Sequence, residues 1–135
     1  MIKIQGFTLI ELLIVLAILA IISGIAYPSY QTLIIETRRA DAQNVLIKAQ
    51  IEQSSYRIMH ASYINNISVA GLPSDHQYYS FSIESASAST YLMKATVKTN
   101  SSQNADENAC KTLFIDQNSV KTSDGITDNA HCWRQ

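Results

Sequence analysis

Cysteine is scarce in this chain of 135 residues, which has only Cys110 and Cys132. The two have neither Cys-x-x-Cys spacing nor a supporting pattern of histidines, so their spacing predicts no zinc site. An excess of charge is also lacking. The formal net charge is -1 and the sequence pI is about 6.3, so no strong field attracts nucleic acid or an anionic membrane surface. The length has room for one domain.

Recognisable catalytic motifs are missing as well. The three histidines, His60, His76 and His131, are scattered, and none is placed with a second histidine or a cysteine at ligand spacing. Nothing resembles a nucleophile elbow, a phosphate-binding loop or a metal motif. The sequence therefore predicts a protein that is not an enzyme and that needs no cofactor or metal. Each histidine is expected to be an ordinary surface or loop residue.

One long apolar segment dominates the N-terminus. The 21 residues from Phe7 to Tyr27 are almost wholly apolar, close to the roughly 20 that a helix needs to cross a bilayer. Lys3 precedes them, and the positive-inside tendency predicts that this end stays cytoplasmic while the bulk is exported. In a secretory signal the small cleavage residue follows the apolar part. Here Gly6 precedes it, so cleavage would remove six residues and leave the helix on the mature protein.

Glu11 is the anomaly within this segment, because a carboxylate inside a membrane span is costly and usually signals function. The segment holds no Lys or Arg to pair with it. A cut after Gly6 would create a cation, the new α-amino group of Phe7, four residues from Glu11. A neighbouring subunit staggered along the helix axis could then supply the amine. The alternative is a plain single-span anchor whose glutamate lies near the membrane interface.

The residues around this cut carry a family resemblance. The segment Gln5-Gly6-Phe7-Thr8-Leu9-Ile10-Glu11, followed by an unbroken apolar helix, resembles the processing site of type IV pilins. The resemblance implies that a prepilin peptidase removes residues 1–6 and methylates Phe7, and that Glu11 pairs with a neighbour's N-terminus during assembly. It further implies other pilin subunits as partners. The chain would lie in the inner membrane first and in an extracellular pilus afterwards.

The resemblance continues at both ends of the chain and is weak in the middle. Tyr27-Pro28-Ser29-Tyr30 and Arg38-Arg39-Ala40-Asp41-Ala42 are similar to the PilE branch of minor pilins, as are the segments 110–117 and 132–133. The sequence departs from that pattern at Asn118-Ser119, where a glycine is expected in the turn. This departure concerns only the local turn geometry.

Periodicity predicts one helix from about Thr8 to about His60. Beyond the membrane segment, apolar residues recur at steps of three and four and form one stripe: Ala42, Val45, Leu46, Ala49 and Tyr56. Pro28 falls inside the helix and removes one hydrogen bond, so a kink between Gly24 and Pro28 is expected. At about 1.5 Å per residue such a helix is far longer than a small domain is wide, which suits a polymer core.

The second half of the chain predicts strands. Residues 78–84 and 91–98 alternate between apolar and polar side chains, and 112–116 with 120–122 read as a hairpin. An antiparallel sheet laid on the second half of the helix would bury both apolar faces. The expected fold is therefore α+β, with a long kinked helix that is half transmembrane, and the resemblance implies that it is the type IV pilin fold. The expected division is a leader (1–6), a membrane or filament-core helix (7–33) and a globular pilin domain (34–135).

The cysteines bracket the last hairpin. A bond between Cys110 and Cys132 would enclose about 20 residues and stabilise the end of the chain by roughly 3 kcal/mol in the loop-entropy model. Export to an oxidising compartment favours this bond, and free thiols are the alternative. The tail from Ser123 holds little apolar material, so we expect it to fray without such a link.

Two groups of charged residues leave alternatives open. Five basic residues could form a patch that contacts nucleic acid: Lys94, Lys98, Lys111, Lys121 and Arg134. Acidic residues interleave with them, which favours a mixed, solvated surface. A DNA-binding role would depend on Lys111, Lys121 and Arg134. Arg38, Arg39 and Asp41 follow the membrane segment. They either bridge neighbouring subunits or form a hydrated helix face.

These observations rank the possible functions. The first is a structural subunit of a type IV pilus, more specifically a minor pilin that acts in assembly. The second is a DNA-uptake or adhesion subunit that binds DNA or a host surface through the region bounded by Cys110 and Cys132. The third is a secretion-system pseudopilin, which shares the N-terminal motif but is disfavoured by the resemblance of the C-terminus.

Overall fold

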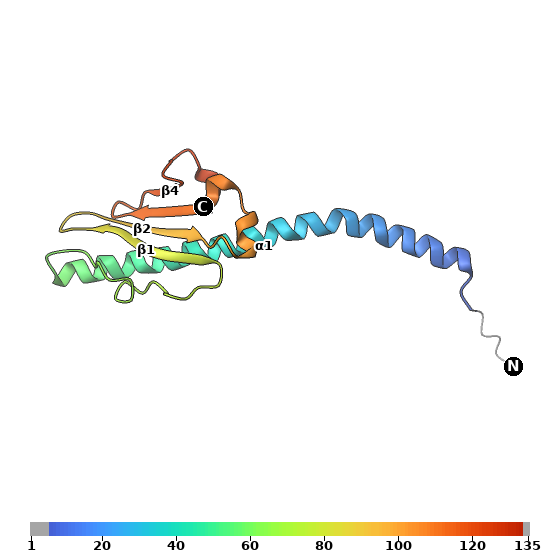
Figure 1. The fold of residues 1–135 in the computed structure, drawn as a ribbon, viewed down its shortest axis with the longest axis horizontal. Helices are drawn as coiled ribbons and strands as arrows, with labels where there is room; N and C mark the ends of the chain where they lie inside the picture. Colours follow the sequence, from blue (N-terminus) through green and yellow to red (C-terminus); the bar gives the residue numbers. More distant parts are fainter. Residues whose placement is uncertain (1–5, 134–135) are drawn as a thin grey trace. The chain divides into compact units, whose positions relative to one another are not determined.

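The computed structural model describes residues 6–133, in which one long helix is followed by a four-stranded sheet (Figure 1). Helix α1 spans Leu9–Met59, which confirms the predicted helix to within a residue at each end. The chain divides into two compact units, Met1–Ile34 and Ile35–Gln135. The first half of α1 therefore belongs to one unit, and its second half belongs to the other together with the sheet.

Pro28 lies inside α1, and the helix continues through it. Proline has no N–H, so the carbonyl of Gly24 receives no helical hydrogen bond at this point. One turn further on, the Thr32 hydroxyl donates to the Pro28 carbonyl at 3.3 Å. The helix thus tolerates the proline, and the expected kink between Gly24 and Pro28 stays a prediction.

The strands form an antiparallel sheet in the order β1-β2-β3-β4, so each strand pairs with its neighbour in sequence. Their bounds are Tyr79–Ala86, Tyr91–Val97, Thr112–Asp116 and Lys121–Ser123. The sheet and the C-terminal hairpin were both predicted, with ends shifted by one or two residues. Short 3-10 helices at Ser102–Ala105, Asn108–Cys110 and Ala130–Cys132 complete the chain.

The turn between β3 and β4 explains why glycine was expected there. Ser119 has a φ of 62°, in the left-handed region that glycine enters most easily. The side chain of Asp116 stabilises the turn, because its Oδ1 accepts from the amides of Asn118 and Val120, each at 2.8 Å. This aspartate supports a turn that lacks the glycine.

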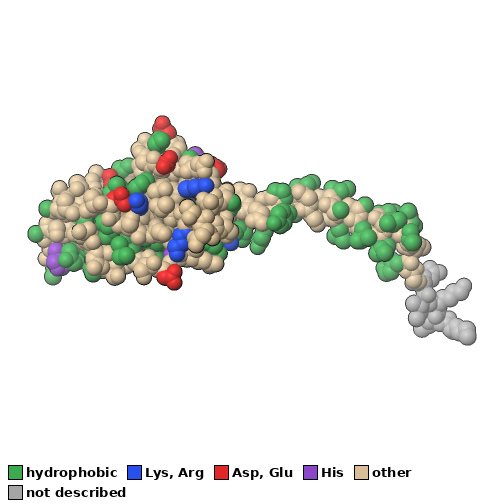
Figure 2. All heavy atoms as spheres, viewed as in Figure 1, with side chains coloured by type: hydrophobic (Ala, Val, Ile, Leu, Met, Phe, Trp, Pro, Cys, Tyr) green, Lys and Arg blue, Asp and Glu red, His purple; other side chains and the backbone are tan. Residues whose placement is uncertain are grey.

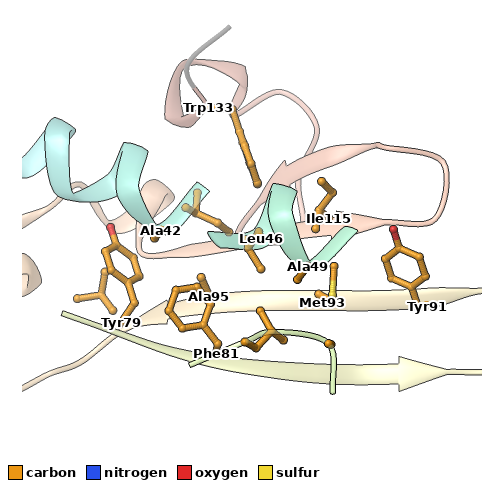
Figure 3. Packing of buried hydrophobic residues seen from close by; sticks show 14 of the residues in the cluster. Ala42, Leu46, Ala49, Tyr79, Phe81, Tyr91, Met93, Ala95, Ile115 and Trp133 are labelled. Atoms are coloured by element: carbon orange, nitrogen blue, oxygen red, sulfur yellow. The ribbon is translucent and has the colours of Figure 1, made fainter. Parts of the chain in front are cut away.

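The core lies between the second half of α1 and one face of the sheet (Figure 3). Ala42, Leu46 and Ala49 of the predicted stripe are at most 1% exposed, whereas Val45 and Tyr56 pack at its margin. Strand β2 alternates between buried and half-buried residues along its whole length, as its sequence period predicts. Its inward residues meet the helix stripe and those of the neighbouring strands: Tyr91, Met93, Ala95, Val97, Tyr79, Leu113 and Ile115.

The end of the chain is fastened to this core. A disulfide joins Cys110 to Cys132 across a sequence separation of 22 residues, which confirms the expected pairing. Trp133 is 5% exposed, and its ring N–H donates to the Thr122 carbonyl at 2.8 Å. Gln43 of α1 donates to the carbonyl of Cys132 at 2.7 Å. The last described residues are therefore anchored by packing and hydrogen bonds as well as by the disulfide.

Replacing Leu46 tests the core. Leu46→Ala should lower the free energy of unfolding by about 2–5 kcal/mol, because it leaves a cavity between helix and sheet. Urea titration of the full chain in detergent micelles can follow the fluorescence of Trp133, the single tryptophan. Ile58→Ala is the matched control, since Ile58 lies in the same helix but is 84% exposed and should change stability by less than about 0.5 kcal/mol. Equal losses in the two variants would contradict the packing described here.

Candidate functional site

The N-terminal end of α1 is organised around Glu11. Its Oε2 accepts hydrogen bonds from the backbone N–H of Thr8 at 2.8 Å and from the Thr8 hydroxyl at 2.7 Å. In return, the Glu11 amide donates to the Thr8 hydroxyl at 3.3 Å. This reciprocal pattern is a capping box, which satisfies free amides at the start of a helix. Within the described chain, all the hydrogen bonds to this carboxylate go to Oε2.

The apolar surface beyond Glu11 is exposed among the residues that the structure describes. Every residue from 6 to 33 is exposed, and Phe7, the residue after the predicted cut, is 94% exposed. Hydrophobic side chains line this part of the helix in Figure 2. The segment is long and apolar enough to cross a membrane, and none of it is buried inside the chain. It is therefore a surface for lipid or for the helices of other subunits.

A buried ion pair lies at the start of the globular unit. Arg39 is 8% exposed and donates through two nitrogens to the carboxylate of Asp106, 67 residues away. Gln103 donates to Asp106 at 3.2 Å and to the Ile35 carbonyl at 3.0 Å. Burial opposes the charge of Arg39, but the bond to Asp106 and nearby negative charge outweigh it and raise the pKa of the guanidinium. Together these bonds fasten the loop before β3 to α1.

The two expectations for Arg38, Arg39 and Asp41 were a subunit bridge or a hydrated face. Within the globular unit, the side chains of all three contact residues of the loops that follow α1, although Asp41 remains 65% exposed. The Arg38 guanidinium lies 4.1 Å from the centroid of the Tyr78 ring and donates to Ser102 at 2.8 Å. Asp41 lies 3.1 Å from the ring Nε2 of His76. Sequence could not reveal these contacts, because each partner is more than 30 residues away.

His76 is more than an ordinary loop residue. Its side chain is 15% exposed, and its Nδ1 accepts hydrogen bonds from the amides of Tyr78 and Tyr79 at 3.2 and 3.1 Å. The ring also packs edge-on against Phe81, with centroids 5.4 Å apart. His76 therefore organises the chain just before β1 and links it to α1 through Asp41.

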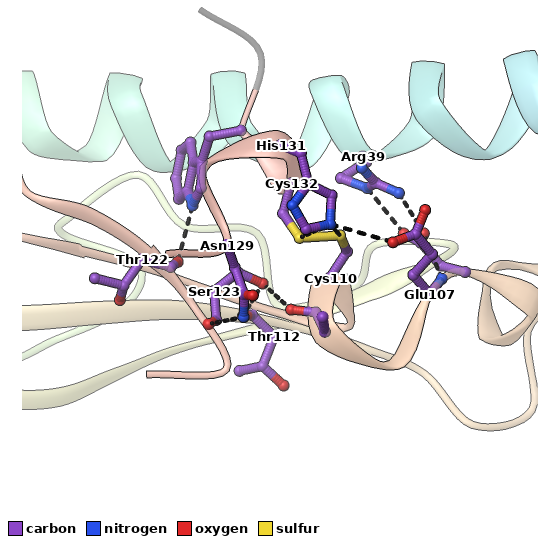
Figure 4. Close-up of a disulfide and its surroundings, with 12 residues drawn as sticks. Arg39, Glu107, Cys110, Thr112, Thr122, Ser123, Asn129, His131 and Cys132 are labelled. Atoms are coloured by element: carbon purple, nitrogen blue, oxygen red, sulfur yellow. Dashed lines mark hydrogen bonds and ion pairs between the residues drawn. A yellow bond between two sulfur atoms is a disulfide. The ribbon is translucent and has the colours of Figure 1, made fainter. Parts of the chain in front are cut away.

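His131 also departs from expectation, because it lies directly over the disulfide (Figure 4). Its Nε2 is 3.7 Å from the sulfur of Cys110 and 3.6 Å from that of Cys132. The same nitrogen lies 3.2 Å from a carboxylate oxygen of Glu107. The prediction that no histidine is placed with the cysteines at ligand distance was wrong, because Cys132 follows His131 directly and the short 3-10 helix turns the ring back over both sulfurs.

The lysines divide into paired and unpaired residues. Lys94 lies 2.7 Å from Glu84, and Lys98 lies 3.9 Å from Asp75. Lys111 and Lys121 form no ion pair with any carboxylate of the described chain, and Lys121 lies 5.7 Å from the centroid of the Trp133 ring. Arg134 lies outside the described residues. Figure 2 shows basic and acidic side chains interspersed on the visible face of the globular unit.

An exposed apolar helix with a capped glutamate at its start, and a sheet unit closed by a C-terminal disulfide, define a pilin-class subunit. Comparisons agree. Residues 1–27 match the prokaryotic N-terminal methylation motif, and residues 28–114 match the family described as type IV minor pilin ComP, DNA uptake sequence receptor. The chain belongs to the type IV pilin family and, within it, to the ComP-like minor pilins.

Individual relatives support this assignment. The chain is 38% identical over 99 residues to the type IV wide pilus major component PilA4 of Thermus thermophilus, covering 67% of this chain and 72% of that protein. It is 30% identical over 103 residues to a fimbrial protein of Neisseria meningitidis, covering 74% of this chain and 59% of the relative. A solved type IV pilin from Shewanella oneidensis shares the fold, with a TM-score of 0.55 and 21% identity over 75% of this chain and 99% of that one.

Family membership establishes the general function. The chain is a structural subunit of a type IV pilus, a minor pilin, and not an enzyme. Its methylation motif is a processing site for prepilin peptidase, and its partners in assembly are other pilin subunits. The protein is anchored in a membrane by its apolar helix and then assembled into a pilus.

The buried ion pair should be a strong determinant of stability. Arg39→Met leaves the Asp106 carboxylate, 1% exposed, without its cation, and should cost about 3–5 kcal/mol of unfolding free energy. Arg38→Met is the matched control, because the neighbouring side chain is only half-buried and should cost about 1 kcal/mol or less. Urea unfolding followed by Trp133 fluorescence measures both. A loss for Arg39→Met no larger than that for Arg38→Met would show that the pair contributes little.

Proposed function

We propose that this minor pilin enters the filament through an ion pair between Glu11 and the α-amino group of Phe7 on a neighbouring subunit. The amine is produced when prepilin peptidase cuts after Gly6. The observation that carries the proposal is the capping box, in which Thr8 holds Oε2 of Glu11 while Oε1 accepts no bond within the described chain. One oxygen orients the carboxylate, and the other is left for the incoming cation.

The same helix determines where the protein lies before and after assembly. Before assembly, residues 7–33 lie in the inner membrane and the globular unit, residues 34–135, faces the periplasm. In the filament, the apolar surface that lipid covered is covered by the helices of other subunits, and the globular unit becomes extracellular. Pro28 is part of the assembly segment, because the missing hydrogen bond at Gly24 allows the helix to adapt its local path.

Neutralising Glu11 tests the ion pair. Glu11→Gln keeps the size of the side chain but removes the charge, so the fraction of this subunit in sheared filaments should fall at least about tenfold relative to the membrane pool. Immunoblots of filament and membrane fractions measure this ratio. Glu36→Gln is the control, because Glu36 is an exposed glutamate of the same helix beyond the apolar segment. Normal incorporation of Glu11→Gln would exclude this mechanism of entry.

A second function, binding of DNA, is favoured by two independent observations. The matching family is described as a DNA uptake sequence receptor, and Lys111 and Lys121 have no acidic partner in the described chain. Lys121 pairs with Ile115 at the turn end of the β3–β4 hairpin, whereas Lys111 precedes β3 at the opposite end. A nucleic acid that lay along the hairpin would meet both amines. Arg134 follows directly after Trp133, whose ring centroid is 5.7 Å from Lys121.

The net charge limits what this surface can do. At a formal charge of -1, the long-range field does not attract DNA, so binding depends on a few local phosphate contacts. A protein that binds DNA through so few phosphate contacts needs either several copies that bind together or a contact to base edges in order to act in DNA uptake. The region bounded by Cys110 and Cys132 is the part of the chain where such contacts would be made.

The lysines give a measurable signature. The double variant Lys111→Gln, Lys121→Gln should bind a fluorescent DNA duplex more weakly, and the slope of log K against log salt should become shallower by about 0.9 per lost phosphate contact. Fluorescence anisotropy with the full chain in detergent micelles measures both quantities. Lys48→Gln, on an exposed position of α1, is the control for loss of charge. If the double variant and this control bound DNA equally well, the hairpin would not be the contact surface.

A further inference from the structure

Three metal-ligating side chains gather at the disulfide, those of Cys110, His131 and Cys132, and Glu107 lies beside His131. The two sulfurs and a ring nitrogen of His131 all lie within 4.8 Å of one another. Glu107 adds a carboxylate oxygen 3.2 Å from His131 Nε2. Figure 4 shows the imidazole between the sulfurs and this carboxylate. Thiolate, imidazole and carboxylate are the three ligand types that zinc prefers.

The distances fit a zinc site. With bonds of about 2.3 Å to sulfur and about 2.0–2.1 Å to nitrogen and oxygen, a tetrahedral zinc separates a nitrogen from a sulfur by about 3.6 Å and from an oxygen by about 3.3 Å. His131 Nε2 lies 3.7 and 3.6 Å from the two sulfurs and 3.2 Å from the Glu107 oxygen. All three separations from the histidine are therefore already those of a zinc tetrahedron. The two sulfurs must move apart, which breaking the disulfide allows. The exposed side chain of Glu107 must also rotate toward them, because its carboxylate does not lie within 4.8 Å of both sulfurs.

We propose that the chain binds one Zn²⁺ through Cys110, Cys132, His131 and Glu107 before its disulfide closes. Binding releases two thiol protons: two Cys–SH and Zn²⁺ give a zinc dithiolate and two H⁺. A disulfide oxidant later takes two electrons from the thiolates. Cys110 and Cys132 join, the oxidant leaves as a dithiol that has taken up two protons, and Zn²⁺ is released. The metal and the disulfide are thus alternative links at the same place.

The ligands are placed by bonds that do not need the disulfide. The amide of Cys110 donates to the Glu107 carbonyl, and that of Cys132 donates to the Asn129 carbonyl, each at 2.9 Å. Glu107 is further held because its amide donates to the Asp106 carboxylate at 2.8 Å. Gln43 of α1 fixes the carbonyl of Cys132. These contacts keep the four ligands together while the cysteines are still thiols.

Access also fits a metal that arrives and leaves. The sulfur residues are buried, with Cys110 at 0% and Cys132 at 1% exposure. The side chains of His131 and Glu107 are 56% and 66% exposed and face solvent. An ion can therefore enter past the two exposed ligands and reach thiolates that sit in a dry, protected position. A purely structural His131–Glu107 ion pair at the surface would gain little stability on its own.

The test uses the full chain in detergent micelles, reduced with a phosphine and kept free of oxygen. Titration with Co²⁺, which reports thiolate ligation by its absorption, followed by competition with Zn²⁺ should give one metal per chain. The oxidised chain should bind none. His131→Ala should weaken binding at least about tenfold, and Glu107→Gln should weaken it by a smaller factor. His60→Ala, which removes a histidine far from the cysteines in sequence, should leave the affinity unchanged.

Two results would overturn the proposal. One is an absence of saturable metal binding by the reduced chain. The other is equal affinity in the chain with His131→Ala, since two thiols alone would then hold the metal. Reduction can loosen the end of the chain, but this does not obscure the outcome, because metal stoichiometry and thiolate absorption are read directly. Both exposed ligands can be replaced without disturbing the core.

Discussion

The apolar side chains in the first half of α1 are exposed in the described part of the chain, and the function of the molecule depends on how they are covered. Residues 6–33 are exposed throughout, and their large side chains are mostly isoleucine and leucine. Such a surface is stable only in lipid or against other apolar helices. A single subunit therefore cannot be the final state of this protein in water. Membrane anchoring and polymerisation are two ways of covering the same side chains.

The second half of the same helix meets the opposite requirement, because it must carry a unit that is stable on its own. It does so with few apolar residues, chiefly Ala42, Leu46 and Ala49, packed against the inner face of the sheet. Polar links supplement this small core: the Arg39–Asp106 pair, Gln43 at the carbonyl of Cys132, and Gln53 at Ile64. The first two join α1 to segments 67 and 89 residues away, and the third fastens the chain that directly follows the helix. The helix is therefore the common support of these segments.

Local patterns were sufficient to predict the fold but not the contacts between distant loops. The helix from Leu9 to Met59 and the strands follow from periods of 3.6 and 2, and the Cys110–Cys132 pairing follows from there being only two cysteines. The Arg39–Asp106 and Asp41–His76 contacts were not predicted. The local sequence around Arg39 and Asp41 in the helix gives no information about partners that lie 67 and 35 residues away. His131 was missed although it adjoins Cys132, since its place over the sulfurs depends on a single turn of 3-10 helix.

Glu11 is a side chain that can be accommodated both in the membrane and in the proposed filament. In lipid, a carboxylate needs hydrogen-bond donors within reach, and Thr8 provides two on the same oxygen. This capping box also satisfies amides at the start of the helix. It leaves the second oxygen unused in the described chain, so the isolated subunit remains incompletely satisfied. In the ion pair proposed above, a cation from a neighbouring helix would remove that deficit, and it could do so only at one stagger of the two helices. In the assembly proposed here, Glu11 leaves one oxygen without a hydrogen bond in the membrane, and the same residue sets the register between subunits in the filament.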